Sequence, residues 1–160
     1  MVQSINRRQF LRGDLQGRRA SLRPPWAINE ADFVQLCTSC GDCISNCPES
    51  ILIKADAGYP AIDFHSGECT FCQSCLYACD TGALKFSTNP WYLTLDINDS
   101  CLAKNSIVCS VCAEQCETSA IRFNPVVGGV SQPEIDMTLC IGCGACIRPC
   151  PNTSISLFNE

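Results

Sequence analysis

The sequence has no long apolar run, which limits where the chain can reside. A bilayer-spanning helix needs roughly 18 consecutive apolar residues, and no stretch approaches that length. The segment "RRQFL" at residues 7–11 resembles the head of a twin-arginine export signal, but the roughly 7–15 apolar residues that such a signal requires do not follow it. We therefore expect a cytoplasmic chain with no membrane span.

Basic side chains are scarce beyond residue 23. Residues 1–23 carry six arginines against Asp14, a net charge of +5, whereas the remaining chain has five basic residues against 15 acidic ones, a net charge of −10. Nucleic-acid binding requires a basic face, so the acidic body argues against a nucleic-acid partner. The basic head is either a solvated tail or a docking arm, whose guanidinium groups bind carboxylates of a partner or of the body itself.

Histidine occurs only once, as His65, which has no second metal-ligand residue at a suitable spacing and is expected at the surface. No acid–base or nucleophilic constellation marks a catalytic site, and we predict that the chain is not an enzyme. Cysteine, in contrast, is abundant, with 16 in 160 residues. In a short secreted protein that density would indicate a disulfide scaffold, so the spacing of the cysteines decides their role.

The cysteines fall into four sets of four. The first, second and fourth sets have the spacing C-x2-C-x2-C-x3-C, and the third has C-x7-C-x2-C-x3-C. In bacterial ferredoxins, this pattern lets three close thiolates hold one cubane while the fourth reaches another. We predict four [4Fe–4S] clusters with every cysteine as an iron ligand. The sets are Cys37, Cys40, Cys43 and Cys47; Cys69, Cys72, Cys75 and Cys79; Cys101, Cys109, Cys112 and Cys116; and Cys140, Cys143, Cys146 and Cys150.

Small residues between the cysteines suit loops that wrap closely around a cluster. Without large side chains, the backbone N–H groups can approach the cluster sulfurs. The small residues in question are Ser39, Gly41, Gly142 and Gly144. A short helix is expected after the third cysteine of each set, and Pro48 and Pro151 suit its first turn, where an N–H has no partner.

Other roles for the cysteines fit the spacing less well. Disulfides would not require the same cysteine spacing three times, and nothing else in the sequence indicates an oxidising compartment. Structural zinc uses paired C-x2-C knuckles about 12–20 residues apart. Within the cluster interpretation, Cys101 is the open point, because it lies eight positions before Cys109 where the usual gap is three. Cys101 is either a fourth ligand or a spare thiol that leaves a three-ligand site, suited to a three-iron cluster.

The chain also repeats itself. Cys37 and Cys109 lie 72 positions apart, and Cys69 and Cys140 lie 71 apart. After each fourth cysteine, the segments "PESILI", "DTGALKF", "ETSAIRF" and "PNTSISLF" predict a helical turn that leads to a short strand. The predicted fold class is α+β, with two tandem ferredoxin-like units. The expected divisions are a basic arm at residues 1–26, a first unit at 27–88 and a second at 89–160.

Within each unit, the fourth cysteine of one set is expected to complete the site of the other set. This tandem pairing joins Cys79 to the first three cysteines of set one, Cys47 to those of set two, Cys150 to those of set three and Cys116 to those of set four. A nested arrangement, in which set one pairs with set four and set two with set three, is the alternative. Units this small bury little apolar surface, so the iron-free chain is expected to be largely unfolded.

Apolar residues around position 90 connect the two units. Trp91, Tyr92, Leu93 and Leu95 either seal the joint between the units, which we favour, or face a partner. Trp26, which follows two prolines, is expected to pin the basic arm to the body.

The four cysteine sets, together with "RRQFLRG", "RPPW", "GYPAIDF" and "CLAKNSIVC", resemble the NapF family of ferredoxin-type proteins of the bacterial periplasmic nitrate reductase system. The resemblance covers essentially the whole chain, with Asp80 replacing a proline that often follows the fourth cysteine. It implies a cytoplasmic protein that binds the precursor of the catalytic subunit NapA before export, and assists its maturation by helping cluster loading or supplying electrons. The alternative is a general electron-transfer polyferredoxin with a redox partner protein.

Overall fold

The helices in the part of the chain that the structure describes are short, and in the first unit only one exceeds a single turn. A computed structural model describes residues 21–159, so Arg7, Arg8 and most of the predicted arm lie outside the described residues. Helix α2 (Glu30–Leu36) begins after Asn29, whose side-chain oxygen accepts a hydrogen bond from the Asp32 N–H at 3.1 Å. This cap satisfies a free backbone donor, and the helix buries Phe33, which is only 1% exposed.

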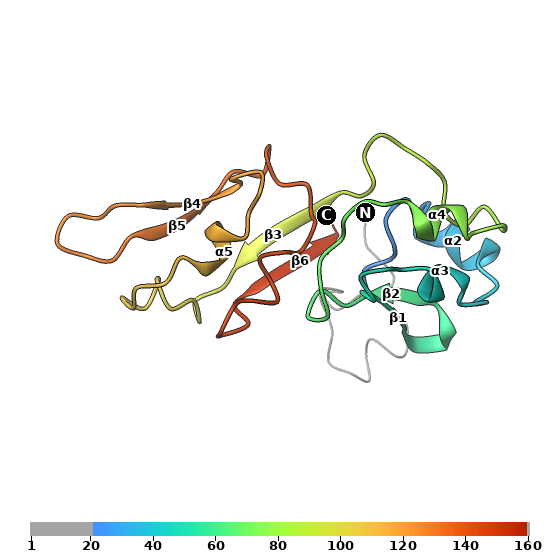
Figure 1. The fold of residues 1–160 in the computed structure, drawn as a ribbon, viewed down its shortest axis with the longest axis horizontal. Helices are drawn as coiled ribbons and strands as arrows, with labels where there is room; N and C mark the ends of the chain where they lie inside the picture. The colour runs from blue at the N-terminus through green and yellow to red at the C-terminus, as the bar shows by residue number, and fades with distance from the viewer. Residues whose placement is uncertain (1–20, 160) are drawn as a thin grey trace.

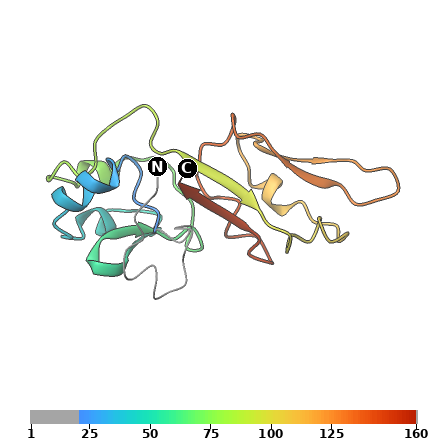
Figure 2. The same ribbon diagram turned by 180° about the vertical axis from the view of Figure 1, so that it is seen from behind.

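Two similar antiparallel hairpins reflect the internal repeat. In the first unit, β1 (Leu52–Lys54) pairs with β2 (Pro60–Ile62), and a 3-10 turn, η1 (Asp56–Gly58), connects them. In the second, β4 (Ile121–Asn124) pairs with β5 (Gln132–Ile135). Figure 1 shows the two hairpins at opposite parts of an elongated molecule, with the view from behind in Figure 2 giving the same arrangement. The α+β class with two units is confirmed.

A further strand pair closes the second unit. Strand β3 (Leu93–Ile97) pairs antiparallel with the C-terminal strand β6 (Ile155–Asn159). Leu95 of β3 lies opposite Leu157 of β6, and both side chains are buried in the core. In the first unit, the same contact is only a bridge between Ala27 and Leu84. The expected strand in "DTGALKF" is therefore wrong. Its partner segment contains two prolines and Trp26 at φ 64°, which end a ladder.

The short helices lie earlier than expected. Helices α3 (Asp42–Ser45), α4 (Ser74–Tyr77) and α5 (Val111–Glu114) each contain the third cysteine of their set rather than following it. Pro48 and Pro151 lie in turns after the fourth cysteine, so their expected place in a first helical turn is wrong. The left-handed residues Gly41 and Gln73 force a change of direction immediately after the second cysteine, and the helices begin there.

The segment joining the units is fixed by tryptophans. Trp26 is 5% exposed, its backbone N–H donates to the Pro90 carbonyl at 2.7 Å, and its indole N–H donates to the Ser87 carbonyl at 3.0 Å. The expected anchor at Trp26 is thus present, and it holds residues 24–26 against the connection between units.

Of the four apolar residues expected at the joint, Leu95 is buried, and Trp91 and Leu93 are partly buried. Tyr92 is 71% exposed, so its predicted burial is wrong. Tyr92 precedes β3, where alternate side chains point to opposite faces. His65 is exposed, as expected. In the part of the chain that the structure describes, no helix is both long and apolar enough to cross a bilayer.

Candidate iron–sulfur sites

Left-handed residues surround the second cysteine in three of the four sets. In the first set, Ser39 and Gly41 have φ values of 57° and 88°. The corresponding pairs in the second and fourth sets also have positive φ, and they are Phe71, Gln73, Gly142 and Gly144. This conformation turns successive backbone N–H groups toward one side of the loop, as in other anion-binding backbone nests. The small residues identified from the sequence therefore share one unusual backbone geometry.

The third set reaches its site by a different backbone path. Ser110, which follows its second cysteine, has φ −138° in place of a left-handed value. Cys101 lies at the start of a series of turns, where its N–H donates to the Asn98 carbonyl at 3.2 Å and its own carbonyl accepts from the Asn105 side chain at 2.9 Å. The seven residues between Cys101 and Cys109 thus fold back on themselves.

A left-handed residue also lies three positions after the fourth cysteine of every set. These residues are Ser50, Gly82, Ser119 and Thr153. The resulting turn directs backbone N–H groups to the fourth cysteine: the Ala120 N–H donates to Cys116 Sγ at 3.2 Å and the Ser154 N–H donates to Cys150 Sγ at 3.4 Å. Such donors stabilise a thiolate.

Hydroxyl groups near the fourth cysteines were missed in the sequence. Thr81 Oγ1 lies 3.5 Å from Cys79 Sγ, and Thr118 Oγ1 lies 3.6 Å from Cys116 Sγ. Burial raises the pKa of both thiols, but hydrogen bonds from the threonine hydroxyl and the following backbone outweigh it, so the net pKa is lowered. The available signal was a threonine two positions after the fourth cysteine in sets two and three.

The structure brings together the two thiol groups that tandem pairing predicts in the first unit. Burial, followed by the charges of Cys37, Cys40 and Cys79, raises the pKa of Cys43 to about 11. These four cysteines, Cys37, Cys40, Cys43 and Cys79, are called site 1.

Site 2 comprises the first three cysteines of the second set and Cys47. Burial raises the pKa of Cys75 to about 12, with further contributions from Cys69, Cys43 and Cys47. Helix α3, which carries Cys43 of site 1, contacts helix α4, which carries Cys75 of site 2, so the two sites are neighbours.

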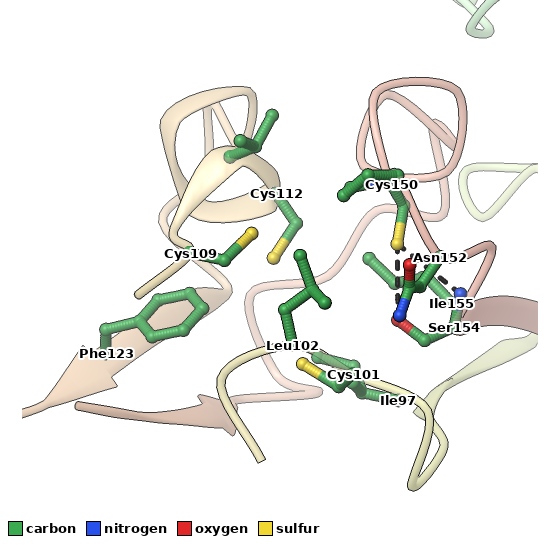
Figure 3. Close-up of a pocket in the computed structure, with 12 residues that line it drawn as sticks. Ile97, Cys101, Leu102, Cys109, Cys112, Phe123, Cys150, Asn152, Ser154 and Ile155 are labelled. Carbon is green, nitrogen blue, oxygen red and sulfur yellow. Dashed lines mark hydrogen bonds between the residues drawn. The ribbon is translucent and has the colours of Figure 1, made fainter. Parts of the chain in front are cut away.

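The second unit contains two pockets, each lined by four cysteines. Site 3 is lined by Cys101, Cys109, Cys112 and Cys150. Figure 3 shows Cys109 and Cys112 together on one wall, with Cys101 and Cys150 arriving from two other segments. Site 4 is lined by Cys116, Cys140, Cys143 and Cys146.

Sites 3 and 4 also lie next to each other. Burial raises the pKa of Cys146 to about 12, and the charge of Cys112, a member of site 3, adds to the contributions of Cys143 and Cys140. All four groupings follow the tandem pairing and none follows the nested alternative. Cys101 is 8% exposed and is grouped with three other thiols, which is the placement expected of a ligand.

The donor groups fit iron–sulfur clusters. All sixteen cysteines are free thiols, and thiolates are the ligands of [4Fe–4S] clusters. The iron ligand is the thiolate, so each protonated thiol must lose its proton when iron binds. Within residues 21–159, no three cysteine, histidine or carboxylate groups converge on a point that a single metal ion could occupy. In a cubane, each thiolate instead binds a different iron.

Comparison with known proteins identifies the two halves separately. Residues 22–84 and residues 107–154 each match a family model described as a 4Fe-4S dicluster domain. Two such domains carry four [4Fe–4S] clusters, as predicted.

Several whole proteins are also similar. "Ferredoxin-type protein NapF" of Escherichia coli (strain K12) is 39% identical over 94% of this chain and 93% of its own length. The protein of the same name from Haemophilus influenzae is 41% identical over 98% of this chain and 95% of its own length. "Methylamine utilization ferredoxin-type protein MauM" of Methylobacillus flagellatus is 34% identical over 81% of this chain and 63% of its own length. No solved structure matches the chain.

Proposed function

Because this chain belongs to the NapF family of ferredoxin-type iron–sulfur proteins, which are not enzymes, we propose that the thiols of sites 1 to 4 are the ligands of its four [4Fe–4S] clusters. When bound, the clusters accept and release single electrons. The ligand sets are Cys37, Cys40, Cys43 and Cys79 at site 1; Cys69, Cys72, Cys75 and Cys47 at site 2; Cys101, Cys109, Cys112 and Cys150 at site 3; and Cys140, Cys143, Cys146 and Cys116 at site 4.

The same proposal divides the chain into a basic arm at residues 1–26, a first unit at 27–88 and a second unit at 89–160. The bridge at Ala27 and the pairing of β3 with β6 support these limits, because each brings together the first and last segments of one unit. Arg23 sits at the root of the arm, where its guanidinium binds Glu30 at 2.6 Å and lies over the Phe33 ring at 4.9 Å from the centroid.

The function that we propose is assistance in the cytoplasmic maturation of the periplasmic nitrate reductase catalytic subunit, NapA, before its export. The observation that carries this proposal is the similarity to NapF proteins over nearly the full length of both chains. The separation of charge also supports a binding role. The arginine-rich head has a net charge of +5 and precedes a body of −10, so the two parts of the chain suit partner surfaces of opposite sign.

A truncation tests the role of the arm. A chain that begins at residue 21 keeps Arg23 in its ion pair with Glu30, so the body retains its anchor. We expect the truncated protein to bind four clusters but to lose capture of the unprocessed NapA precursor, and NapA activity in the cell to fall. A matched control replaces the five arginines of residues 1–20 by lysine, which leaves Arg23 and its ion pair in place and keeps the charge without the planar guanidinium. Full NapA activity in cells that lack the whole protein would contradict a maturation role.

A second function, general electron transfer between redox proteins, is favoured by one observation. The neighbouring positions of sites 1 and 2, and of sites 3 and 4, would let electrons pass within each unit. A simple carrier has no evident need for the basic head. Truncation therefore discriminates between the two functions. A truncated carrier keeps its activity both with small redox proteins and with NapA. A truncated maturation partner keeps its activity with small redox proteins but loses its activity with NapA.

A further inference from the structure

The two units touch through their cysteine loops. The N–H of Cys69, the first cysteine of the second set, donates to the carbonyl of Cys143, the second cysteine of the fourth set, at 2.8 Å. One residue belongs to site 2 and the other to site 4. A direct backbone hydrogen bond therefore links a ligand loop of the first unit to a ligand loop of the second.

Trp91 contacts both of these loops. Its indole N–H donates to the Ile141 carbonyl, in the fourth-set loop, at 3.1 Å. Its ring meets the rings of Phe64 and Phe71, which flank the start of the second set, at centroid distances of 5.9 and 5.8 Å in edge-to-face geometry. Edge-to-face contacts of this kind are favourable beyond the area they bury. Trp91 thus holds the two loops in one position.

Glycine makes the close approach possible. A methyl group built on Gly144 would lie 2.1 Å from Cδ1 of Phe64, and one on Gly142 would lie 2.6 Å from the indole nitrogen of Trp91. Gly41 occupies the same place in the first set as Gly144 does in the fourth, immediately after the second cysteine, with a similar φ of 88° against 81°. A methyl group on Gly41 would meet nothing within 4 Å. Gly144 therefore meets a packing requirement that its counterpart does not share.

We propose that this contact, the Cys69–Cys143 junction held by Phe64, Trp91 and Gly144, is the electronic connection between the two units. Since site 1 adjoins site 2 and site 3 adjoins site 4, the junction places the sites in the order 1–2–4–3, with sites 1 and 3 at the ends. With clusters bound at sites 2 and 4, one electron would pass between them, one cluster being oxidised as the other is reduced, with no proton transfer and no bond change. The proposal rests on the ligand sets proposed above.

Electron paramagnetic resonance (EPR) of the anaerobic, fully reduced full-length protein tests the junction. Two paramagnetic clusters split each other's signal, and the splitting falls with the cube of their separation. In Gly144→Ala, the added methyl must push the loop away from Phe64, so we expect loss of the part of the splitting that arises between units. Gly128→Ala introduces an alanine at a similar positive φ of 73°, in the turn between β4 and β5 and outside the cysteine loops, with nothing within 4 Å of the added methyl, and it should keep the wild-type spectrum.

Iron content separates failure of this proposal from failure of the ligand sets. Fewer than four clusters in the wild-type protein would overturn the ligand sets. Full iron in all variants, with a Gly144→Ala spectrum identical to that of Gly128→Ala, would overturn the junction alone. If Gly144→Ala loses iron, Trp91→Ala decides, because it removes the clamp but leaves both glycine loops unchanged. Loss of splitting in Trp91→Ala then supports the junction, and an unchanged spectrum overturns it.

Discussion

Hydroxyl groups at the fourth cysteines adjust individual thiolates. Thr118 Oγ1 lies 3.6 Å from Cys116 Sγ, and Thr81 Oγ1 lies 3.5 Å from Cys79 Sγ. An iron-bound thiolate carries no hydrogen, so in the loaded protein the threonine must be the donor. Donors to the sulfurs stabilise the more negative, reduced form of a cluster and raise its reduction potential.

Replacing Thr118 by valine should therefore lower the potential of one cluster. The lost hydrogen bond is worth about 1 kcal/mol, which corresponds to about 40 mV for a one-electron couple. Thr118→Ser keeps the hydroxyl and should remain close to the wild-type potential. An EPR-monitored redox titration measures both variants. Equal potentials for valine and serine, at unchanged iron content, would show that the hydroxyl has no effect on the cluster.

Cys101 is the residue for which the sequence left two roles open. Its placement among the thiols of site 3 favours a ligand over a spare thiol. We predict that Cys101→Ser loses one iron and leaves a three-iron cluster, or loses the whole cluster and about four irons. The neighbouring Ser100→Ala, which removes an exposed hydroxyl bonded to Asn98, should keep full iron. Iron analysis with EPR distinguishes the cases, and an unchanged cluster content in Cys101→Ser would identify a spare thiol.

At the scale of the elements, the sequence was most informative where a pattern repeats. Strands β1, β4 and β6 begin in "PESILI", "ETSAIRF" and "PNTSISLF", where the sequence predicts them, whereas the partner strands β2 and β5 were not predicted. The loops follow from cysteine spacing and small residues. The strand expected near Leu84 failed because its partner, not its own sequence, prevents a ladder. Helices α3 and α4 begin earlier than expected because a left-handed residue follows the second cysteine, whereas α5 begins at the corresponding place after Ser110, which is not left-handed.

The junction between the units could not have been predicted from local pattern. It depends on residues that are distant in the sequence, such as Gly144 and Phe64, and on the absence of a single methyl group. The tandem pairing of the cysteines was expected, but spacing alone could not choose it over the nested alternative. Spatial grouping distinguishes the two because Cys79 lies with set one and Cys150 with set three.

The anchor at Trp26 gives a prediction for the first unit. Trp26→Ala removes a buried ring and a hydrogen bond to the Ser87 carbonyl, which should destabilise the unit by about 3–5 kcal/mol. Trp26→Phe removes mainly the hydrogen bond, at a cost of about 1 kcal/mol. Under anaerobic conditions, the urea concentration at which cluster absorption disappears should fall slightly in Trp26→Phe and further in Trp26→Ala. Tyr92→Ala, at an exposed position nearby, should leave this concentration unchanged.

At the scale of the whole molecule, charge controls association. Each oxidised cubane with four thiolates carries a charge of about −2, so four clusters take the chain from −5 to about −13. We predict that binding to a basic partner surface weakens as salt rises through the physiological range, because screening shortens electrostatic reach to about 8 Å at 0.15 M. Affinity measured at several salt concentrations checks this, and a salt-independent affinity would contradict it.

The fold itself depends on the metal sites. The side chains below a tenth exposure include five cysteines, Cys43, Cys75, Cys101, Cys112 and Cys146, so cluster ligands make up part of the small core. Without clusters, these buried thiols lose their main interaction, and units of this size have little other apolar surface to bury.

Iron and acid-labile sulfide, measured per chain together with far-ultraviolet circular dichroism before and after anaerobic iron removal, test the central claim most directly. Four clusters require sixteen iron and sixteen sulfide atoms per chain, and we predict these values, with loss of most of the ordered dichroism signal once the iron is removed. A colourless chain that contains almost no iron and retains a native-like spectrum would contradict the claim that cluster binding holds this fold together.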